Sequence, residues 1–177
     1  MSTREKLPCA VVLAFAAGLG TAIAAEGQRF GQPIAAEDAA AWDISIAPDG
    51  VGLPPGNGTP AQGAVVYAEK CAACHGQKGE GQPNDRLVGG QLTDDQPAVK
   101  TVGSYWPYAT TLFDYTRRAM PWQQPKSLTN DEVYAVSAYI FRLNGIIGDN
   151  DVMNATTLPK VAMPNRDGFI SLYPNKK

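Results

Sequence analysis

Residues 71–76 read Cys71-Ala72-Ala73-Cys74-His75-Gly76, and they contain the chain's single histidine. A Cys-x-x-Cys-His motif is typical of c-type haem attachment, in which each thiol bonds a vinyl group of the haem and the histidine binds the iron. One turn of helix would place both sulfurs along the same edge of the porphyrin. The motif therefore predicts one covalently attached haem c, held by Cys71, Cys74 and His75.

Two other interpretations exist for a cysteine pair at this spacing. Half of a zinc site would need further Cys or His ligands, and the chain has no second histidine. A redox dithiol would not require a histidine beside it. The single histidine also excludes a bis-histidine haem. Lys and Arg total 15 against 17 Asp and Glu, so the chain has no basic footprint and we expect no nucleic-acid partner.

The first 25 residues differ in composition from the rest of the chain. After a short charged start, residues 10–23 form an uncharged apolar run, and Ala22-Ile23-Ala24 has the small residues of a cleavage site. The run is shorter than the roughly 20 apolar residues that span a membrane. We therefore expect residues 1–25 to be a secretory signal peptide, removed together with Cys9. The mature chain would be periplasmic and would have no membrane span; an uncut anchor is the alternative.

A helix is indicated on the N-terminal side of the motif. Thr59-Pro60 is typical of a helix start and predicts a helix that continues to about Cys74. Within it, Gly63, Tyr67 and Cys71 are spaced four residues apart and so lie on one face. A glycine on this face would let a second helix approach closely.

The second helix is indicated nearer the C-terminus. Thr129-Asn130-Asp131-Glu132 is a capping box of the T-x-x-E form, and Asn144-Gly145 supplies a stop. We expect Val136 and Tyr139 to pack on the face of the first helix that carries Gly63. The apolar residues that keep helical spacing are Val133, Val136, Ile140 and Leu143.

On the side of the haem opposite His75, either a methionine or a lysine binds the iron or the position stays open. Three methionines follow residue 25: Met120, Met153 and Met163. Met120 lies between the last helix and a short helix expected over Leu112–Ala119, capped by Thr111, and the proline after Met120 would rigidify the loop. Met163 also precedes a proline, so position decides. We predict that Met120 binds the iron and that the other two fill the core.

In this order, the motifs resemble class I cytochrome c over Pro60 to Gly145. They are Gly63-x-x-x-Tyr67-x-x-x-Cys71-x-x-Cys74-His75-Gly76, Met120-Pro121, and Leu128-Thr129-x-Asp131-Glu132 with Tyr139. The resemblance implies an all-α fold whose first and last helices cross around one covalent haem, with His75 as the proximal and Met120 as the distal iron ligand. The family also has a proline after the motif whose carbonyl orients the imidazole. In this chain Pro83 is the nearest proline after the motif, but it is not a clear counterpart of the family's proline.

Stretches beyond these motifs, some inside the core and some in the extensions, are similar to the cytochrome partners of bacterial sulfite dehydrogenases and of sulfane dehydrogenase. In those systems a molybdenum protein oxidises the sulfur compound, and the cytochrome accepts the electrons one at a time. The resemblance implies an electron-transfer protein, not an enzyme, that donates to another cytochrome or an oxidase as a free carrier or a permanent subunit. A haem gas sensor or haem enzyme with an open distal site is the alternative. The similar stretches are Phe30–Pro33, Ala41–Ile44, Thr101–Ala109, Arg117–Trp122 and Leu158–Phe169.

The chain thus divides into the signal peptide, an N-terminal extension (residues 26–59), a cytochrome domain (60–145) and a C-terminal extension (146–177). Both extensions are rich in Gly, Pro, Asn and Asp and lack helical periodicity, yet their apolar residues predict that they cover the core or a partner. Those residues are Phe30, Trp42, Ile44, Leu53, Phe169, Ile170 and Tyr173. Candidates for the haem rim are Arg86, Tyr105, Trp106, Arg117 and Trp122. Apolar docking is expected around Ala72, Ala73, Pro121 and Trp122.

Overall fold

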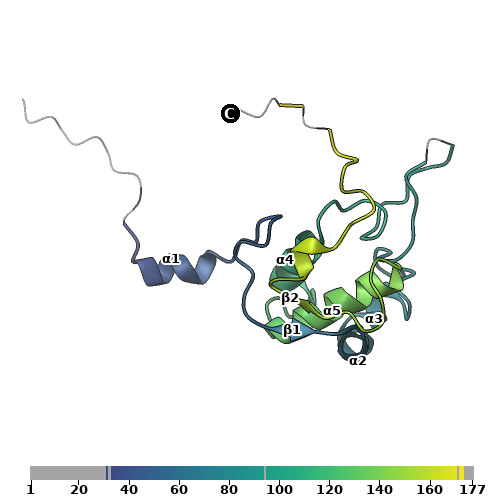
Figure 1. The fold of residues 1–177 in the computed structure, drawn as a ribbon. Helices are drawn as coiled ribbons and strands as arrows, with labels where there is room; N and C mark the ends of the chain where they lie inside the picture. The colour runs from purple at the N-terminus through teal and green to yellow at the C-terminus, as the bar shows by residue number, and fades with distance from the viewer. Residues whose placement is uncertain (1–30, 32, 94, 171, 174–177) are drawn as a thin grey trace, which may run out of the picture.

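The computed structural model describes residues 31, 33–93, 95–170 and 172–173, so the predicted signal peptide and Phe30 lie outside the described residues. The described chain is helical with very little sheet (Figure 1). Among these residues, no helix is both long and apolar enough to cross a membrane. The helices are α1 (Ala36–Trp42), α2 (Pro60–Lys70), α3 (Ala72–His75), α4 (Ala109–Ala119) and α5 (Asn130–Leu143), followed by the 3-10 helix η1 (Leu158–Lys160). The strands are β1 (Asn57–Gly58) and β2 (Met153–Asn154).

Helices α2 and α5 form the centre of the fold. Figure 1 views α2 along its axis while α5 runs across the view, so the two helices cross, as the family resemblance implied. A β-carbon at Gly63 would overlap the carbonyl oxygen of Ala135 and lie 2.8 Å from Cβ of Tyr139. The rings of Tyr67 and Tyr139 lie 5.3 Å apart between centroids. The predicted contact of Tyr139 with the Gly63 face is therefore confirmed.

Both crossing helices begin at capping boxes. The Glu132 amide donates to Thr129 Oγ1 at 3.2 Å, and the Glu132 carboxylate accepts from the Thr129 amide at 2.7 Å, as predicted. The same reciprocal pair forms between Thr59 and Gln62 at 3.3 and 2.9 Å. Each pair satisfies backbone N–H groups that the first turn of a helix leaves without partners.

Two predicted helix boundaries are wrong. The first helix does not continue to Cys74, because it breaks at Cys71, whose φ of −126° leaves the helical region. The Cys71 carbonyl instead accepts from the amides of Cys74 and His75 at 3.1 and 3.0 Å, which starts the short α3. Helix α4 begins at Ala109, so Thr111 lies inside it and is not its cap.

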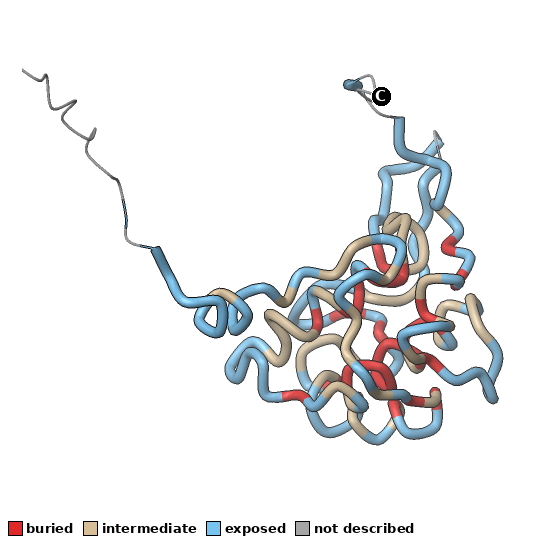
Figure 2. The backbone as a smooth tube through the Cα atoms, turned by 60° about the vertical axis from the view of Figure 1, so that its left-hand side comes forward, coloured by how far each residue is buried: buried red, intermediate tan, exposed pale blue. Residues whose placement is uncertain are grey.

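The N-terminal extension contains a helix that the sequence did not predict. Helix α1 buries none of its residues and stands away from the body, where Figure 2 shows it mainly as exposed chain. Trp42 is 77% exposed, with the Lys126 ammonium 5.3 Å from its ring centroid. Beyond α1 the chain reaches the core: Leu53 packs against it, and the Tyr134 hydroxyl donates to the Pro54 carbonyl at 2.8 Å.

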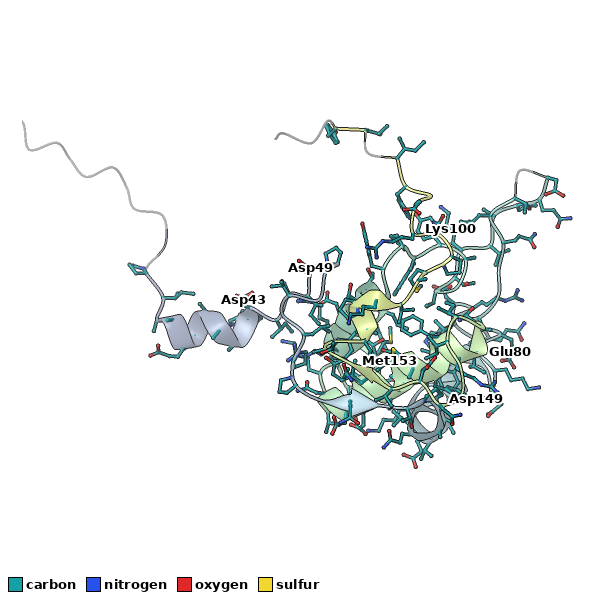
Figure 3. The ribbon with its side chains drawn as sticks, viewed as in Figure 1. Asp43, Asp49, Glu80, Lys100, Asp149 and Met153 are labelled. Atoms are coloured by element: carbon teal, nitrogen blue, oxygen red, sulfur yellow. The ribbon has the colours of Figure 1, made fainter. Side chains whose placement is uncertain are left out.

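The C-terminal extension packs on the body first and then leaves it. Strand β2 pairs antiparallel with β1, which ties the two extensions together. Met153 and Met163 are buried core residues, as predicted, and Figure 3 shows Met153 within the body. Ile170 is exposed farther along, while the Phe169 ring contacts that of Tyr105 at 5.2 Å between centroids.

Candidate functional site

One cavity of about 620 Å³ brings together all four residues that the sequence singled out: Cys71, Cys74, His75 and Met120. The cysteines and His75 come from the junction of α2 with α3, whereas Met120 comes from the end of α4. Apolar side chains supply much of the remaining wall. These are Leu87, Val102, Trp106, Leu112, Val136 and Ile140.

The imidazole of His75 is oriented by a backbone carbonyl. Its Nδ1 lies 2.8 Å from the carbonyl oxygen of Asp85, and because a carbonyl can only accept, Nδ1 carries the proton. With the proton on Nδ1, Nε2 is the nitrogen left to bind a metal ion. The orienting carbonyl therefore belongs to Asp85, and Pro83 is not the residue that provides it.

Backbone hydrogen bonds hold the loop that carries Asp85 against the motif. The Asn84 amide donates to the Cys74 carbonyl at 2.9 Å, and the Gly81 amide donates to the His75 carbonyl at 2.8 Å. The Tyr67 hydroxyl donates to the Gly76 carbonyl at 2.9 Å. Burial raises the pKa of Tyr67 far above its ordinary value, so this hydroxyl remains a neutral donor.

The two thiols are free and half-buried. Before haem attaches, burial raises the pKa of the Cys71 thiol to about 11. Among the described residues, His, Cys, Asp and Glu nowhere gather in groups of three that could hold a metal ion. The alternative of a zinc site therefore has no support in the described part of the chain.

Of the methionines that the structure describes, Met120 is the one that lines the cavity. It caps the C-terminal end of α4 with an extended backbone, and its amide donates to the Thr116 carbonyl at 3.0 Å. Met153 and Met163 are buried in the core and do not line the cavity. Two sulfurs for attachment, one imidazole and one thioether around apolar walls form a donor set that fits a haem.

Of the predicted rim residues, Arg86, Trp106 and Trp122 line the cavity, whereas Tyr105 and Arg117 do not. Lys100, which was not among the predicted rim residues, also lines the cavity, with its ammonium 4.8 Å from the Tyr105 ring centroid. Lys100 belongs to no motif, so nothing in the sequence marks it as a residue of the cavity.

Only some of the residues expected at the docking surface are exposed. Trp122 is 76% exposed at the cavity, and Ala73 is exposed, but Ala72 is buried against the core. The expectation that Ala72 lies at the surface is therefore wrong, because α3 turns that methyl group inward.

Residues 58–140 match the family model described as cytochrome c oxidase, cbb3-type, subunit III. A chain in the crystal structure of the sulfane dehydrogenase SoxCD from Paracoccus pantotrophus is 40% identical, with a TM-score of 0.74 over 84% of this chain and 73% of that one. This chain belongs to the cytochrome c family. As a cytochrome c domain it implies covalently bound haem c, and it is related to haem partners of sulfur-compound dehydrogenases.

Two curated relatives match the cytochrome over a shorter stretch. Thiosulfate dehydrogenase from Psychrobacter arcticus is 32% identical over 83 residues, which is 46% of this chain and 25% of that protein. The cbb3-type cytochrome c oxidase subunit CcoP from Cereibacter sphaeroides is 34% identical over 86 residues, which is 48% of this chain and 28% of that protein. The cytochrome thus spans about a quarter of these relatives, whereas its likeness to the SoxCD chain continues into the extensions.

Proposed function

We propose that this protein is a monohaem, periplasmic electron-transfer cytochrome, exported through the signal peptide predicted in residues 1–25. It accepts single electrons from a molybdenum-dependent sulfite, sulfane or related sulfur-compound dehydrogenase and passes them to another cytochrome or an oxidase. The observation that carries the proposal is the meeting of Cys71, Cys74, His75 and Met120 at one cavity. The 40% identity to a chain of SoxCD supports the class of donor.

Each of these residues has a separate role. Cys71 and Cys74 would hold the haem covalently, and His75 and Met120 would bind its iron. Bound haem supplies one-electron cycling between ferric and ferrous iron. The thioether of Met120 is a weak donor to ferric iron and so favours the ferrous state, which suits an acceptor of electrons from a dehydrogenase.

The number of cytochrome reductions for each substrate molecule follows from the oxidation of sulfite. Oxidation of sulfite to sulfate takes up one water and releases two protons and two electrons. A monohaem carrier takes one electron at a time, so each sulfite reduces two molecules of the cytochrome or one molecule twice.

The exposed helix α1 supports a lasting association with the dehydrogenase. It buries none of its residues on this chain, and both Ile34 before it and Trp42 at its end are largely exposed. Apolar side chains that are exposed close together on the surface are candidates for contact with a partner. On this proposal α1 contacts the dehydrogenase, while the cavity mouth at Trp122 faces its redox centre.

Two measurements test the proposal. Mass spectrometry of the protein purified from its own organism and then denatured should give the mass of the chain without its signal peptide plus the mass of one haem. Mixing the ferric protein with a sulfite or sulfane dehydrogenase and its substrate should reduce the haem far faster than the substrate alone does. A mature mass without covalent haem would refute the cofactor, and equal rates with and without the enzyme would refute the donor.

A further inference from the structure

Asn144 joins the end of helix α5 to the loop that follows the haem motif. Its Oδ1 accepts from the Gly89 amide at 2.9 Å, while its Nδ2 donates to the carbonyls of Leu87 at 3.2 Å and Ile140 at 2.9 Å. The side-chain amide therefore makes three hydrogen bonds, two of them to the loop and one to its own helix. A side chain that bridges two segments in this way fixes their relative position.

The loop is also held at its other end. The Asn84 amide donates to the Cys74 carbonyl at 2.9 Å, and the Leu87 amide donates to the Gly79 carbonyl at 2.9 Å. Asp85 lies between these two points, and its carbonyl accepts from Nδ1 of His75. The position of that carbonyl thus depends on the motif on one side and on Asn144 on the other.

A third segment closes around the same amide group. A β-carbon at Gly103 would overlap the side chain of Asn144, so this segment approaches the amide as closely as a glycine allows. The Thr101 hydroxyl donates to the Gly89 carbonyl, so Gly89 is bound through both its N–H and its C=O. Thr101 itself lines the cavity.

We propose that Asn144 is a positioning residue for the His75 ligand: by holding Leu87 and Gly89 it keeps the Asp85 carbonyl on Nδ1 of His75. The inference rests on the proposed role of His75 as an iron ligand. A hydrogen bond from the second ring nitrogen to a carbonyl makes the imidazole a stronger electron donor, which favours ferric iron. Loosening the loop should weaken that donation and raise the reduction potential.

The test compares the asparagines at the two ends of α5 in the haem-loaded protein: Asn130, its first residue, and Asn144, its C-cap. Asn144→Ala removes the bridge to the loop, whereas Asn130→Ala removes a single bond at the opposite end of the helix, from Nδ2 to the Pro55 carbonyl at 3.2 Å. We expect Asn144→Ala to raise the reduction potential and to speed solvent exchange of the His75 Nδ1 proton, followed by NMR. The exchange should be ~10-fold faster, which corresponds to about 1.4 kcal/mol, within the range of one hydrogen bond. Asn130→Ala should change neither.

A merely structural role would lower stability in both variants and leave the potential and the exchange rate at wild-type values; that result would overturn the inference. Equal shifts in both variants would overturn it as well. If Asn144→Ala does not fold, the wild-type protein still provides a test. The Gly89 amide and the His75 Nδ1 proton should then exchange at a common opening rate, and fast exchange of Gly89 beside a protected His75 would refute the coupling.

The milder variant Asn144→Asp adds a further check. It retains an acceptor for the Gly89 amide but places a carboxylate oxygen against the carbonyls of Leu87 and Ile140, so it should also speed exchange at His75. Unchanged exchange in this variant would count against the inference. All these measurements use protein that already carries haem, so their failure is distinct from failure of haem attachment.

Discussion

Gly63 of α2 and Ala135 of α5 meet backbone to backbone, because a β-carbon at Gly63 would overlap the Ala135 carbonyl oxygen. Gly63→Ala should therefore destabilise the protein, although alanine is the better helix former by ~1 kcal/mol. Overpacking at a closed contact costs about 1–3 kcal/mol, so after the gain in helix propensity we expect a net loss in the free energy of unfolding of up to about 2 kcal/mol. Chemical denaturation measures the change. Ala68→Leu on the exposed face of the same helix should stay within about 0.5 kcal/mol, and an equal loss there would remove the special role of the crossing.

The ion pair between Lys70 and Glu132 predicts a pH dependence of stability. Its atoms lie 2.6 Å apart, and the hydrogen bond from Lys70, together with those at Thr129, lowers the pKa of Glu132 below its ordinary 4.5. A lowered folded-state pKa stabilises the protein above the unfolded-state value, and this contribution is lost as pH falls through the folded-state value. Glu132→Gln retains a capping side chain, so it should cost only about 0.5 kcal/mol at pH 7 for this partly exposed pair. Plotted against pH, the free energies of unfolding of the wild type and of Glu132→Gln should converge below pH 4.5. A difference that stays constant as the pH falls would contradict the prediction.

Met120 and Met163 should respond differently to truncation. Met120→Ala should abolish the charge-transfer absorption band between sulfur and ferric iron and should open the ferrous haem to carbon monoxide. Met163 is 3% exposed in the core, so Met163→Ala should keep the band and cost about 3 kcal/mol of stability. Near-infrared absorption and denaturation separate the two effects. The assignment of Met120 fails if the band disappears in the Met163 variant and persists in the other.

Electron transfer from the dehydrogenase should depend weakly on salt. The chain has a formal net charge of −2, so it creates no strong long-range field, and docking would rely on apolar contact at Trp122. The stopped-flow rate should fall little as the Debye length shrinks from about 30 to about 8 Å. Trp122→Ala should slow second-order reduction by ~10-fold, which is the effect of 1.4 kcal/mol. A steep salt dependence would retain the partner but refute the apolar docking surface.

Trp42 should contribute more to association with the dehydrogenase than to the stability of the fold. Its side chain is 77% exposed and contacts the Lys126 ammonium, an exposed contact that contributes about 0.5–1 kcal/mol. Trp42→Ala should therefore leave unfolding nearly unchanged while it weakens association with the dehydrogenase, measured by calorimetry. Leu53→Ala is the matched control, because Leu53 packs against the core and its truncation should cost stability. Unaltered affinity in the Trp42 variant would exclude α1 from the interface.

Local signals were sufficient for the parts of the molecule that depend on neighbouring residues. The T-x-x-E box at Thr129, the start at Thr59-Pro60 and the stop at Asn144-Gly145 each act within one turn of chain, and all appear where the sequence indicates. The break at Cys71 was missed because nothing in the residue types marks it.

The sequence by itself indicated the Cys-x-x-Cys-His motif, the two central helices and Met120 as the methionine nearest the site, because residue type and spacing carry those features. Only the tertiary structure decided which carbonyl orients His75 and which side chain holds that carbonyl in place. The Asp85 acceptor is a backbone atom, which every residue type possesses, and Asn144 lies 55 positions from the Gly89 amide that it binds. Such contacts arise when α5 packs across the loop, so they depend on packing between distant segments and leave no local pattern.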